Sequence, residues 1–145
     1  MNDMSILEAR TVEDAALVSF DPLPVSYSGV EVRMSPENLP FDVEEVSHFI
    51  FKEPGIRVNG YANKSAPKYI FALSGEVFLE LKDGKSEVEY SLSDPCSAVY
   101  IPEGIWTEFT VASPVIVVSL TGLPAVELAS DRIENYDQFL EWKNS

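Results

Sequence analysis

The residues best suited to chemistry in this chain lie close together, between Arg57 and Lys64. These two cations flank Tyr61 and Asn63, and one or two locally placed Arg or Lys side chains are enough to bind a phosphorylated small molecule. A tyrosine phenol, with an unperturbed pKa of about 10, can donate a proton but is a poor base at neutral pH, and an asparagine amide does not titrate. The segment therefore offers cations and a proton donor, but no base.

The only histidine of the chain is His48, in a stretch that we expect to be the strand before this segment. Histidine is the side chain whose unperturbed pKa best suits a general base at neutral pH. Two interpretations stay open. His48 is a packed or exposed strand residue, or it is a relocated base that acts with Tyr61; the absence of an orienting carboxylate in the sequence favours the first.

Two predicted strands position these residues. The sequence from Arg57 to Gly75 predicts a strand that ends in a turn at Gly60, then a short polar loop, then a second strand that ends at Ser74 and Gly75. In a small β-barrel such a loop lies at the barrel mouth, where ligands bind because a rigid sheet fixes the loop residues.

The rest of the chain repeats this pattern of short strands and turns. Asp83–Gly84 separates two alternating runs, Val77–Leu81 and Val88–Leu92, and predicts a hairpin with a type I′ turn. Further strands are predicted at Val30–Met34, Val43–Phe51, Cys96–Ile101, Trp106–Val111 and Val115–Leu120. No helix-length period interrupts them, so the sequence predicts an all-β sandwich or barrel of antiparallel strands.

The two ends of the chain are less regular. Residues 1–28 form an irregular N-terminal segment, in which Thr11–Asp14 resembles a capping box and Ala15–Phe20 is compatible with either a helix or a strand. Residues 130–142 have the spacing of a short amphipathic helix. We expect that helix to cover the barrel; a tail that docks a partner is the alternative.

Composition limits the function classes. The 145 residues predict one domain, 1–145, and the net charge of −14 argues against a nucleic acid or an anionic membrane as partner. No long apolar run or signal pattern is found, and the single cysteine, Cys96, fits a reducing compartment, so we expect a cytoplasmic protein. Cys96 itself is expected to be a small buried residue at the start of a strand, not a nucleophile.

Three segments together resemble the sugar 3,4-ketoisomerases, which are WxcM-like cupins. They are the turn Ile56–Lys64, the run from Phe71 to Trp106 and the tail Leu128–Trp142, and Gly29–Phe51 is similar to the N-terminal strands of that family. The most specific part is the tail, Ala-Ser-Asp followed by Tyr-Asp-x-Phe-Leu-x-Trp. The resemblance implies a cupin jelly-roll barrel with a short C-terminal helix, assembled as a homodimer that exchanges N-terminal strands.

The resemblance also implies a substrate and a reaction. Members of this family act on dTDP-linked 4-keto-6-deoxyhexoses and exchange a carbonyl with a hydroxyl on neighbouring sugar carbons, which requires a base and a proton donor. By the resemblance, Arg57 and Lys64 bind the diphosphate, and Trp106 stacks on the base or the sugar at the barrel mouth. Each has a structural alternative: Arg57 pairs with an acidic residue, Lys64 is solvated, and Trp106 covers the core.

The chain departs from the family at the residues that carry the chemistry. The two catalytic histidines of the family align with Tyr61 and Asn63, so the base is missing from its expected place. A cupin metal site fails on the same ground, because one histidine and one cysteine cannot supply its ligands, and we expect no metal or other cofactor. Two interpretations follow: a nucleotide-sugar isomerase that uses Tyr61 and His48, or a non-catalytic cupin whose pocket is reassigned or whose role is structural.

Overall fold

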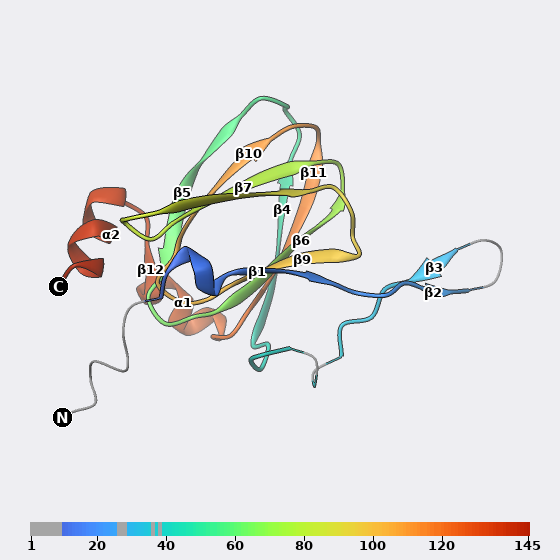
Figure 1. The fold of residues 1–145 in the computed structure, drawn as a ribbon, viewed down its shortest axis with the longest axis horizontal. Helices are drawn as coiled ribbons and strands as arrows, with labels where there is room; N and C mark the ends of the chain where they lie inside the picture. The colour runs from blue at the N-terminus through green and yellow to red at the C-terminus, as the bar shows by residue number, and fades with distance from the viewer. Residues whose placement is uncertain (1–9, 26–28, 36, 38) are drawn as a thin grey trace.

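The computed structural model of the chain describes residues 10–25, 29–35, 37 and 39–145. Two five-stranded sheets face each other and form a flattened barrel (Figure 1). The first sheet has the order β1 (Ala16–Ser19), β9 (Ser97–Ile101), β6 (Lys68–Ser74), β11 (Val115–Thr121), β4 (Glu45–Phe51). The second has the order β12 (Arg132–Ile133), β5 (Arg57–Asn63), β10 (Trp106–Val111), β7 (Val77–Lys82), β8 (Glu87–Leu92).

Alternating side chains from both sheets fill the space between them. Every strand pairing in the described residues is antiparallel. Leu79 and Phe109 of the second sheet and Ile70 and Val117 of the first belong to one buried apolar cluster. The predicted all-β barrel of antiparallel strands is therefore confirmed, and burial of alternate residues explains its strand pattern.

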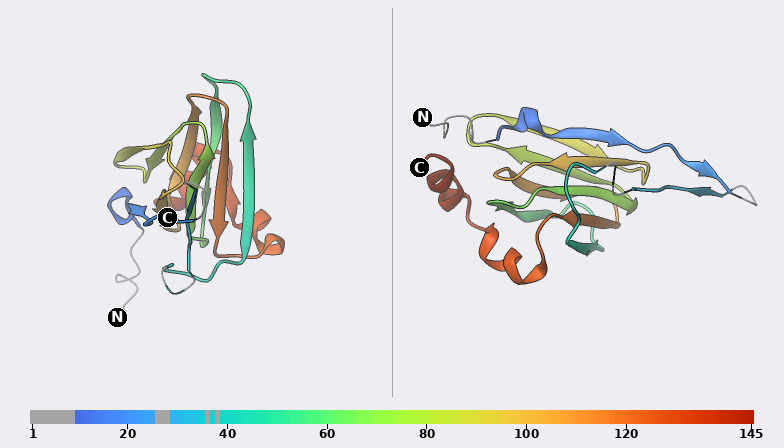
Figure 2. Two further views of the ribbon diagram at one scale, coloured as in Figure 1. Left: turned by 90° about the vertical axis from the view of Figure 1, so that its right-hand side faces the viewer. Right: turned by 90° about the horizontal axis from the view of Figure 1, so that it is seen from below.

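A small hairpin extends away from this barrel. It consists of β2 (Leu23–Pro24) and β3 (Val30–Glu31), and it projects beyond the two sheets (Figure 2, right). The predicted strand Val30–Met34 is shorter than expected, because only its first two residues pair with a neighbouring strand.

The N-terminal segment contains more structure than its sequence indicates. The capping box is confirmed, since the Thr11 and Asp14 side chains and backbones cap the short 3-10 helix Val12–Asp14. The ambiguous stretch Ala15–Phe20 contains β1, which forms the edge of the first sheet by pairing with β9. Residues 1–9 and 26–28 of the predicted irregular segment lie outside the described residues.

The single helix predicted over residues 130–142 is instead two helices with a short strand between them. Helix α1 (Ala125–Asp131) is followed by β12, which pairs with β5, and then by α2 (Tyr136–Lys143). Pairing of Ile133 with Ala62 excludes a helical backbone there, and Asn135 caps α2 by accepting a hydrogen bond from the Gln138 N–H. Among the described residues, no helix is long and apolar enough to cross a membrane.

The Asp83–Gly84 hairpin is confirmed, but its turn is displaced by one residue. The Asp83 N–H donates to the Ser86 carbonyl, so Gly84 and Lys85 are the central residues, and Gly84 has a φ of 95°. The Asp83 carboxylate accepts hydrogen bonds from the backbone N–H groups of Lys85, Ser86 and Val12. These bonds hold the Asp83 side chain at the end of β7 and attach the 3-10 helix Val12–Asp14 to the hairpin.

Gly60 does not end a strand, as the sequence predicted, but lies inside β5. The strand continues to Asn63, and between Val58 and Tyr61 its pairing with β10 shifts register, which is a β-bulge. A Cβ atom on Gly60 would lie 2.4 Å from Nε1 of Trp106. The glycine is therefore required by the close approach of the Trp106 ring, not by a turn.

Candidate active site

A buried polar cluster lies between the sheets at the end of the barrel near α1. We call Tyr61, Asn63, Lys68 and Thr107 the interior cluster; each is at most 6% exposed. Tyr61 pairs in register with Thr107 across β5 and β10, and Lys68 enters from β6 of the opposite sheet. The two positions that the sequence aligns with the catalytic histidines thus lie inside the barrel, beside a lysine that the sequence analysis did not single out.

Contacts within the interior cluster centre on the Lys68 amine. Nζ of Lys68 donates a hydrogen bond to Oδ1 of Asn63 at 2.8 Å. The same nitrogen lies 4.2 Å from the centroid of the Tyr61 ring, within the range of a cation–π contact. Lys68 thereby contacts both Asn63 and Tyr61.

Burial shifts the acid–base properties of this cluster. Loss of solvent lowers the pKa of the Lys68 ammonium to about 7; the charge of Arg132 lowers it too, and the charge of Asp131 opposes the shift. Loss of solvent raises the pKa of the Tyr61 phenol to about 12, against the opposing charge of Arg132. Near neutral pH, Tyr61 is therefore a proton donor and Lys68 is an amine that can hold or release a proton.

Two polar atoms of the interior cluster have no hydrogen-bond partner. They are Nδ2 of Asn63 and Oγ1 of Thr107, and they are the only such buried side-chain atoms in the part of the chain that the structure describes. An unsatisfied buried polar group costs ~1–3 kcal/mol, so natural structures seldom keep one unless a ligand or a water molecule completes it. Both atoms offer hydrogen bonds to a hydroxylated ligand.

Arg132 separates the interior cluster from a surface cavity between β4 and β12, which we call the edge cavity. Its guanidinium carbon lies 4.3 Å from the centroid of the Tyr61 ring, and its side chain also lines a cavity of about 400 Å³. Glu45 and Ser47 of β4 line the same cavity, whose other walls come from α1 and Glu134. A ligand that enters between β4 and β12 would meet Arg132 first.

The loop between β5 and β6 is held by one buried carboxylate. Asp131, at the end of α1, accepts hydrogen bonds from the backbone N–H groups of Ser65 and Ala66. Its own carbonyl accepts from the Lys64 N–H. Asp131 belongs to the Ala-Ser-Asp motif of the tail, so the structure gives that motif the role of positioning the loop that connects Asn63 to Lys68.

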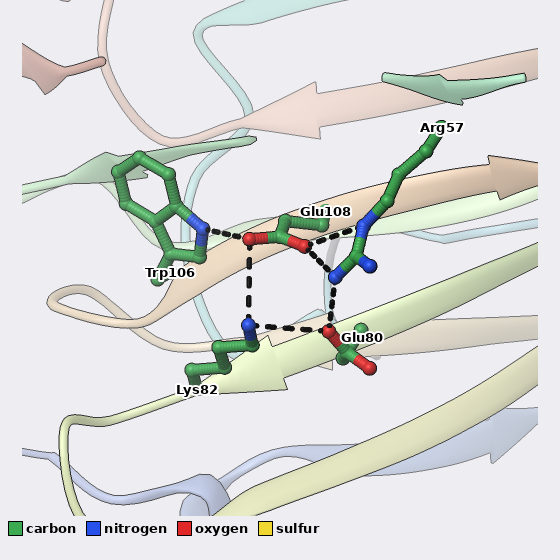
Figure 3. A network of polar contacts seen from close by, with 5 residues as sticks. All are labelled: Arg57, Glu80, Lys82, Trp106 and Glu108. Carbon is green, nitrogen blue, oxygen red and sulfur yellow. Dashed lines mark hydrogen bonds and ion pairs between the residues drawn. The ribbon is translucent and has the colours of Figure 1, made fainter. Parts of the chain in front are cut away.

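Arg57 and Trp106 lie on the other face of the second sheet, away from the interior cluster. Figure 3 shows them in a network with Glu80, Lys82 and Glu108. Arg57 donates to Glu80 at 2.8 Å and also to Glu108, and Nε1 of Trp106 donates to Glu108 at 2.7 Å. Burial alone would raise the pKa of the Glu108 carboxyl, but the hydrogen bonds from Arg57 and Trp106 outweigh it and lower that pKa.

Helix α2 covers part of this outer face. The Trp106 ring packs against Tyr136 and Phe139, with ring centroids 5.2 Å and 5.6 Å away. Trp106 thus belongs to a second apolar cluster with Ala62, Ile133 and Phe139. Arg57 is thus paired with acidic residues, and Trp106 is packed beneath α2.

The remaining predicted site residues are exposed. His48 lies on β4, where Phe49 and Phe51 pack inward against the core, so His48 points to the outer face of the first sheet. The Lys64 side chain is exposed on the loop between β5 and β6. The structure thus brings Tyr61 and Asn63 together and leaves His48 and Lys64 outside the barrel.

The donor set does not form a metal centre. Over the described ranges, no group of three or more His, Cys, Asp or Glu side chains is arranged to hold a metal ion. The interior cluster instead contains an amine, an amide, a phenol and a hydroxyl. Groups of these kinds can donate and accept hydrogen bonds to the oxygen atoms of a ligand.

Comparisons with known proteins agree with the fold and with the sequence motifs. The family described as "FdtA: WxcM-like, C-terminal" matches residues 17–144. None of the curated proteins matches the chain.

Solved structures of similar fold include sugar 3,4-ketoisomerases. QdtA, a sugar 3,4-ketoisomerase from Thermoanaerobacterium thermosaccharolyticum in complex with TDP, is 23% identical, with a TM-score of 0.81 over 90% of this chain and 95% of QdtA. A 3,4-ketoisomerase from Helicobacter canadensis is 19% identical, with a TM-score of 0.83 over 91% of this chain and 98% of that protein. The TDP-quinovose 3,4-ketoisomerase WlaRB from Campylobacter jejuni is 21% identical, with a TM-score of 0.80 over 89% and 98% of the two chains. These likenesses establish the cupin jelly-roll fold expected from the sequence.

Proposed function

Because the chain belongs to the WxcM-like, C-terminal family, we propose that it binds a dTDP-linked sugar between its two sheets and acts as a ketoisomerase on that sugar. The observation that carries the proposal is the interior cluster. By the sequence resemblance, Tyr61 and Asn63 take the positions of the family's catalytic pair, and Asn63 and Thr107 each present an unsatisfied polar atom. A keto sugar has the hydroxyl and carbonyl oxygens that these atoms would bind.

Within this proposal each residue has a defined task. Tyr61, with its raised pKa, donates a proton to the ketone oxygen, and the Asn63 amide orients a neighbouring hydroxyl. Arg132, at the edge cavity, is placed to meet the diphosphate, and the exposed Lys64 adds a second cation. The ligand need not touch Arg57 or Trp106, because both are bonded to Glu108. It need not touch His48 either, because that side chain faces outward.

Binding is tested by thermal unfolding with dTDP and with dTDP-sugars. A ligand present at about 100 times its Kd stabilises a protein by ~2.7 kcal/mol, which raises the melting temperature measurably. We expect Asn63→Leu to weaken binding of a dTDP-sugar, whereas Asn59→Leu, an exposed residue of the same strand, leaves it unchanged. No stabilisation of the wild type by any dTDP compound would refute the proposal.

A non-catalytic cupin is the second candidate, since neither residue at the histidine positions can act as a base at neutral pH. In that case the chain keeps the fold, and its pocket is reassigned or its role is in assembly. Binding of dTDP-4-keto-6-deoxyglucose without any isomerisation would establish this candidate over the first.

We further propose that the protein is a homodimer. Ile50 and Leu73, on the outer face of the first sheet, are 64% and 49% exposed, and a cavity of about 650 Å³ on that face is lined by Phe71, Leu73 and Leu120. Monomers seldom expose apolar patches of this kind, and the projecting β2–β3 hairpin is unprotected unless it pairs with another chain. Light scattering that shows a stable monomer at micromolar concentration would refute the dimer.

The single cysteine, Cys96, is free, which fits a reducing compartment and supports a cytoplasmic location for the protein. Immunoblotting of cell fractions with an antibody against the protein would test this location, and enrichment of the protein outside the cytoplasmic fraction would contradict it.

A further inference from the structure

We infer that Lys68 is the base of this site: its amine, held against Asn63 inside the barrel, takes the proton that the family's histidine would take. The inference rests on the proposed function, because it assumes that a keto sugar binds at the interior cluster. It adds a catalytic residue that neither the sequence motif nor the comparisons assign.

The environment of the Lys68 amine favours its neutral form. The residue is 2% exposed, and Nζ makes one hydrogen bond, to Oδ1 of Asn63. In the part of the chain covered by the structure, no carboxylate forms an ion pair with it. A buried ammonium without a counter-ion is strongly disfavoured, so the neutral amine, which is the form that accepts a proton, is stabilised.

Charged and titratable groups surround this amine. Tyr61 faces the amine from β5, Arg132 from β12 and Asp131 from α1. Glu45 of β4 is aligned with Lys68 across the first sheet, because both residues pair with Thr121 of β11. Arg132 favours the neutral amine, and Asp131 favours the ammonium but is already engaged by the Ser65 and Ala66 N–H groups. Together with burial these charges leave the pKa of Lys68 at about 7, which is the range a general base requires at neutral pH.

Access of a ligand to the Lys68 amine depends on Arg132. Arg132 lies between the edge cavity and the Tyr61 ring, and its ion pair with Glu134 is long, at 3.9 Å, and exposed. Such a pair holds its arginine weakly. A diphosphate that draws the guanidinium toward the cavity would open a path for the ligand from Glu45 and Ser47, past Thr121, to Lys68.

The reaction balances with these groups alone. The neutral Lys68 amine takes the proton from the carbon that bears the hydroxyl next to the ketone, and the C–H electrons form the C=C bond of an enediol. The former ketone oxygen takes a proton from the Tyr61 hydroxyl. The Lys68 ammonium then returns its proton to the former ketone carbon, while the other hydroxyl gives its proton to the Tyr61 oxygen and becomes the new carbonyl. No oxidant, reductant or metal is needed.

The test is exchange of the sugar C–H proton with deuterium, followed by NMR on dTDP-4-keto-6-deoxyglucose in D₂O. We expect Lys68→Met and Lys68→Arg to lower the exchange rate by at least ~10²-fold, since positioned acid–base groups contribute ~10²–10⁴-fold. Lys52→Met, at an exposed lysine beyond the end of β4, serves as the matched control with an unchanged rate. In the wild type the rate should rise with pH and level off above about 7, because the neutral amine is the active form.

Parallel titration of dTDP binding separates the possible failures. Lys68→Met that exchanges at the wild-type rate would overturn the role of Lys68 alone. Wild-type protein that binds dTDP but shows no exchange would overturn that role together with the ketoisomerase activity, and would leave the non-catalytic cupin. Wild-type protein that binds no dTDP compound would overturn both this role and the proposed function. A measurement that needs no variant is NMR of wild-type protein with ¹³C-labelled lysines: one lysine should titrate near neutral pH, and titration of every lysine near its ordinary pKa would also overturn the role.

Discussion

Replacing Lys68 by methionine should remove a pH dependence from the stability of the protein. The pKa of this ammonium falls from 10.5 to about 7 on folding, because burial disfavours the charge. Between these two values the unfolded chain holds the proton and the folded chain does not. Unfolding therefore takes up a proton in this window, and the free energy of unfolding of the wild type rises with pH from about 7 toward about 10.

The size of this effect follows from the pKa change. One pKa unit corresponds to ~1.4 kcal/mol, so the wild type should gain roughly 3 kcal/mol relative to Lys68→Met between about pH 7 and about pH 9.5. The lost hydrogen bond to Asn63 adds a term that does not depend on pH, and the raised pKa of Tyr61 acts above about pH 10 and in both proteins alike.

Urea denaturation followed by circular dichroism at several pH values measures this difference. Urea is preferred to guanidinium chloride because it adds no salt to an electrostatic measurement. A stability difference between the two proteins that stays constant from about pH 7 to about pH 9.5 would refute the reasoning, because it would mean that the Lys68 pKa is the same in the folded and unfolded states.

Three further perturbations test the site, the bulge and the dimer. The double change Tyr61→His and Asn63→His should raise isomerisation of dTDP-4-keto-6-deoxyglucose by at least ~10²-fold over the wild type, because imidazolium is a stronger acid than a phenol whose pKa is about 12; an unchanged rate by NMR would contradict this. Gly60→Ala should lower the free energy of unfolding by ~1–3 kcal/mol in urea denaturation, because its Cβ would overlap the Trp106 ring, and an unaltered midpoint would argue against the bulge geometry. Leu73→Asp should turn the proposed dimer into a monomer in light scattering, since it places a charge on the exposed apolar face; a dimer that persists would move the interface elsewhere.

Local patterns in the sequence predicted the fold well. The alternation on both sides of Asp83–Gly84 gave β7 and β8, because a period of two is a property of neighbouring residues. The division of the tail into α1, β12 and α2 was not predicted, since it depends on the pairing of Ile133 with Ala62, seventy-one residues earlier in the chain. Sequence spacing alone does not reveal such a partner.

The candidate site was less accessible to sequence analysis. Arg57 and Tyr61 are four residues apart, which in a regular strand places them on one face, but the bulge at Gly60 turns Arg57 outward while Tyr61 stays inside. Lys68 carried one signal that was available: it is a charged residue at an inward position of an otherwise apolar strand. What no local pattern shows is that Asn63 lies opposite its amine.

The second apolar cluster makes the protein suitable for spectroscopy. Of the two tryptophans, Trp106 belongs to that cluster and Trp142 packs against it, so neither ring lies in the main core between the sheets. Intrinsic tryptophan emission therefore reports on the docking of α2, whereas far-ultraviolet circular dichroism is dominated by the strands of the barrel. If the tryptophan emission changes at a lower urea concentration than the circular dichroism, α2 leaves the sheet before the barrel unfolds, and one protein supplies separate optical reports of its helix and of its sheets.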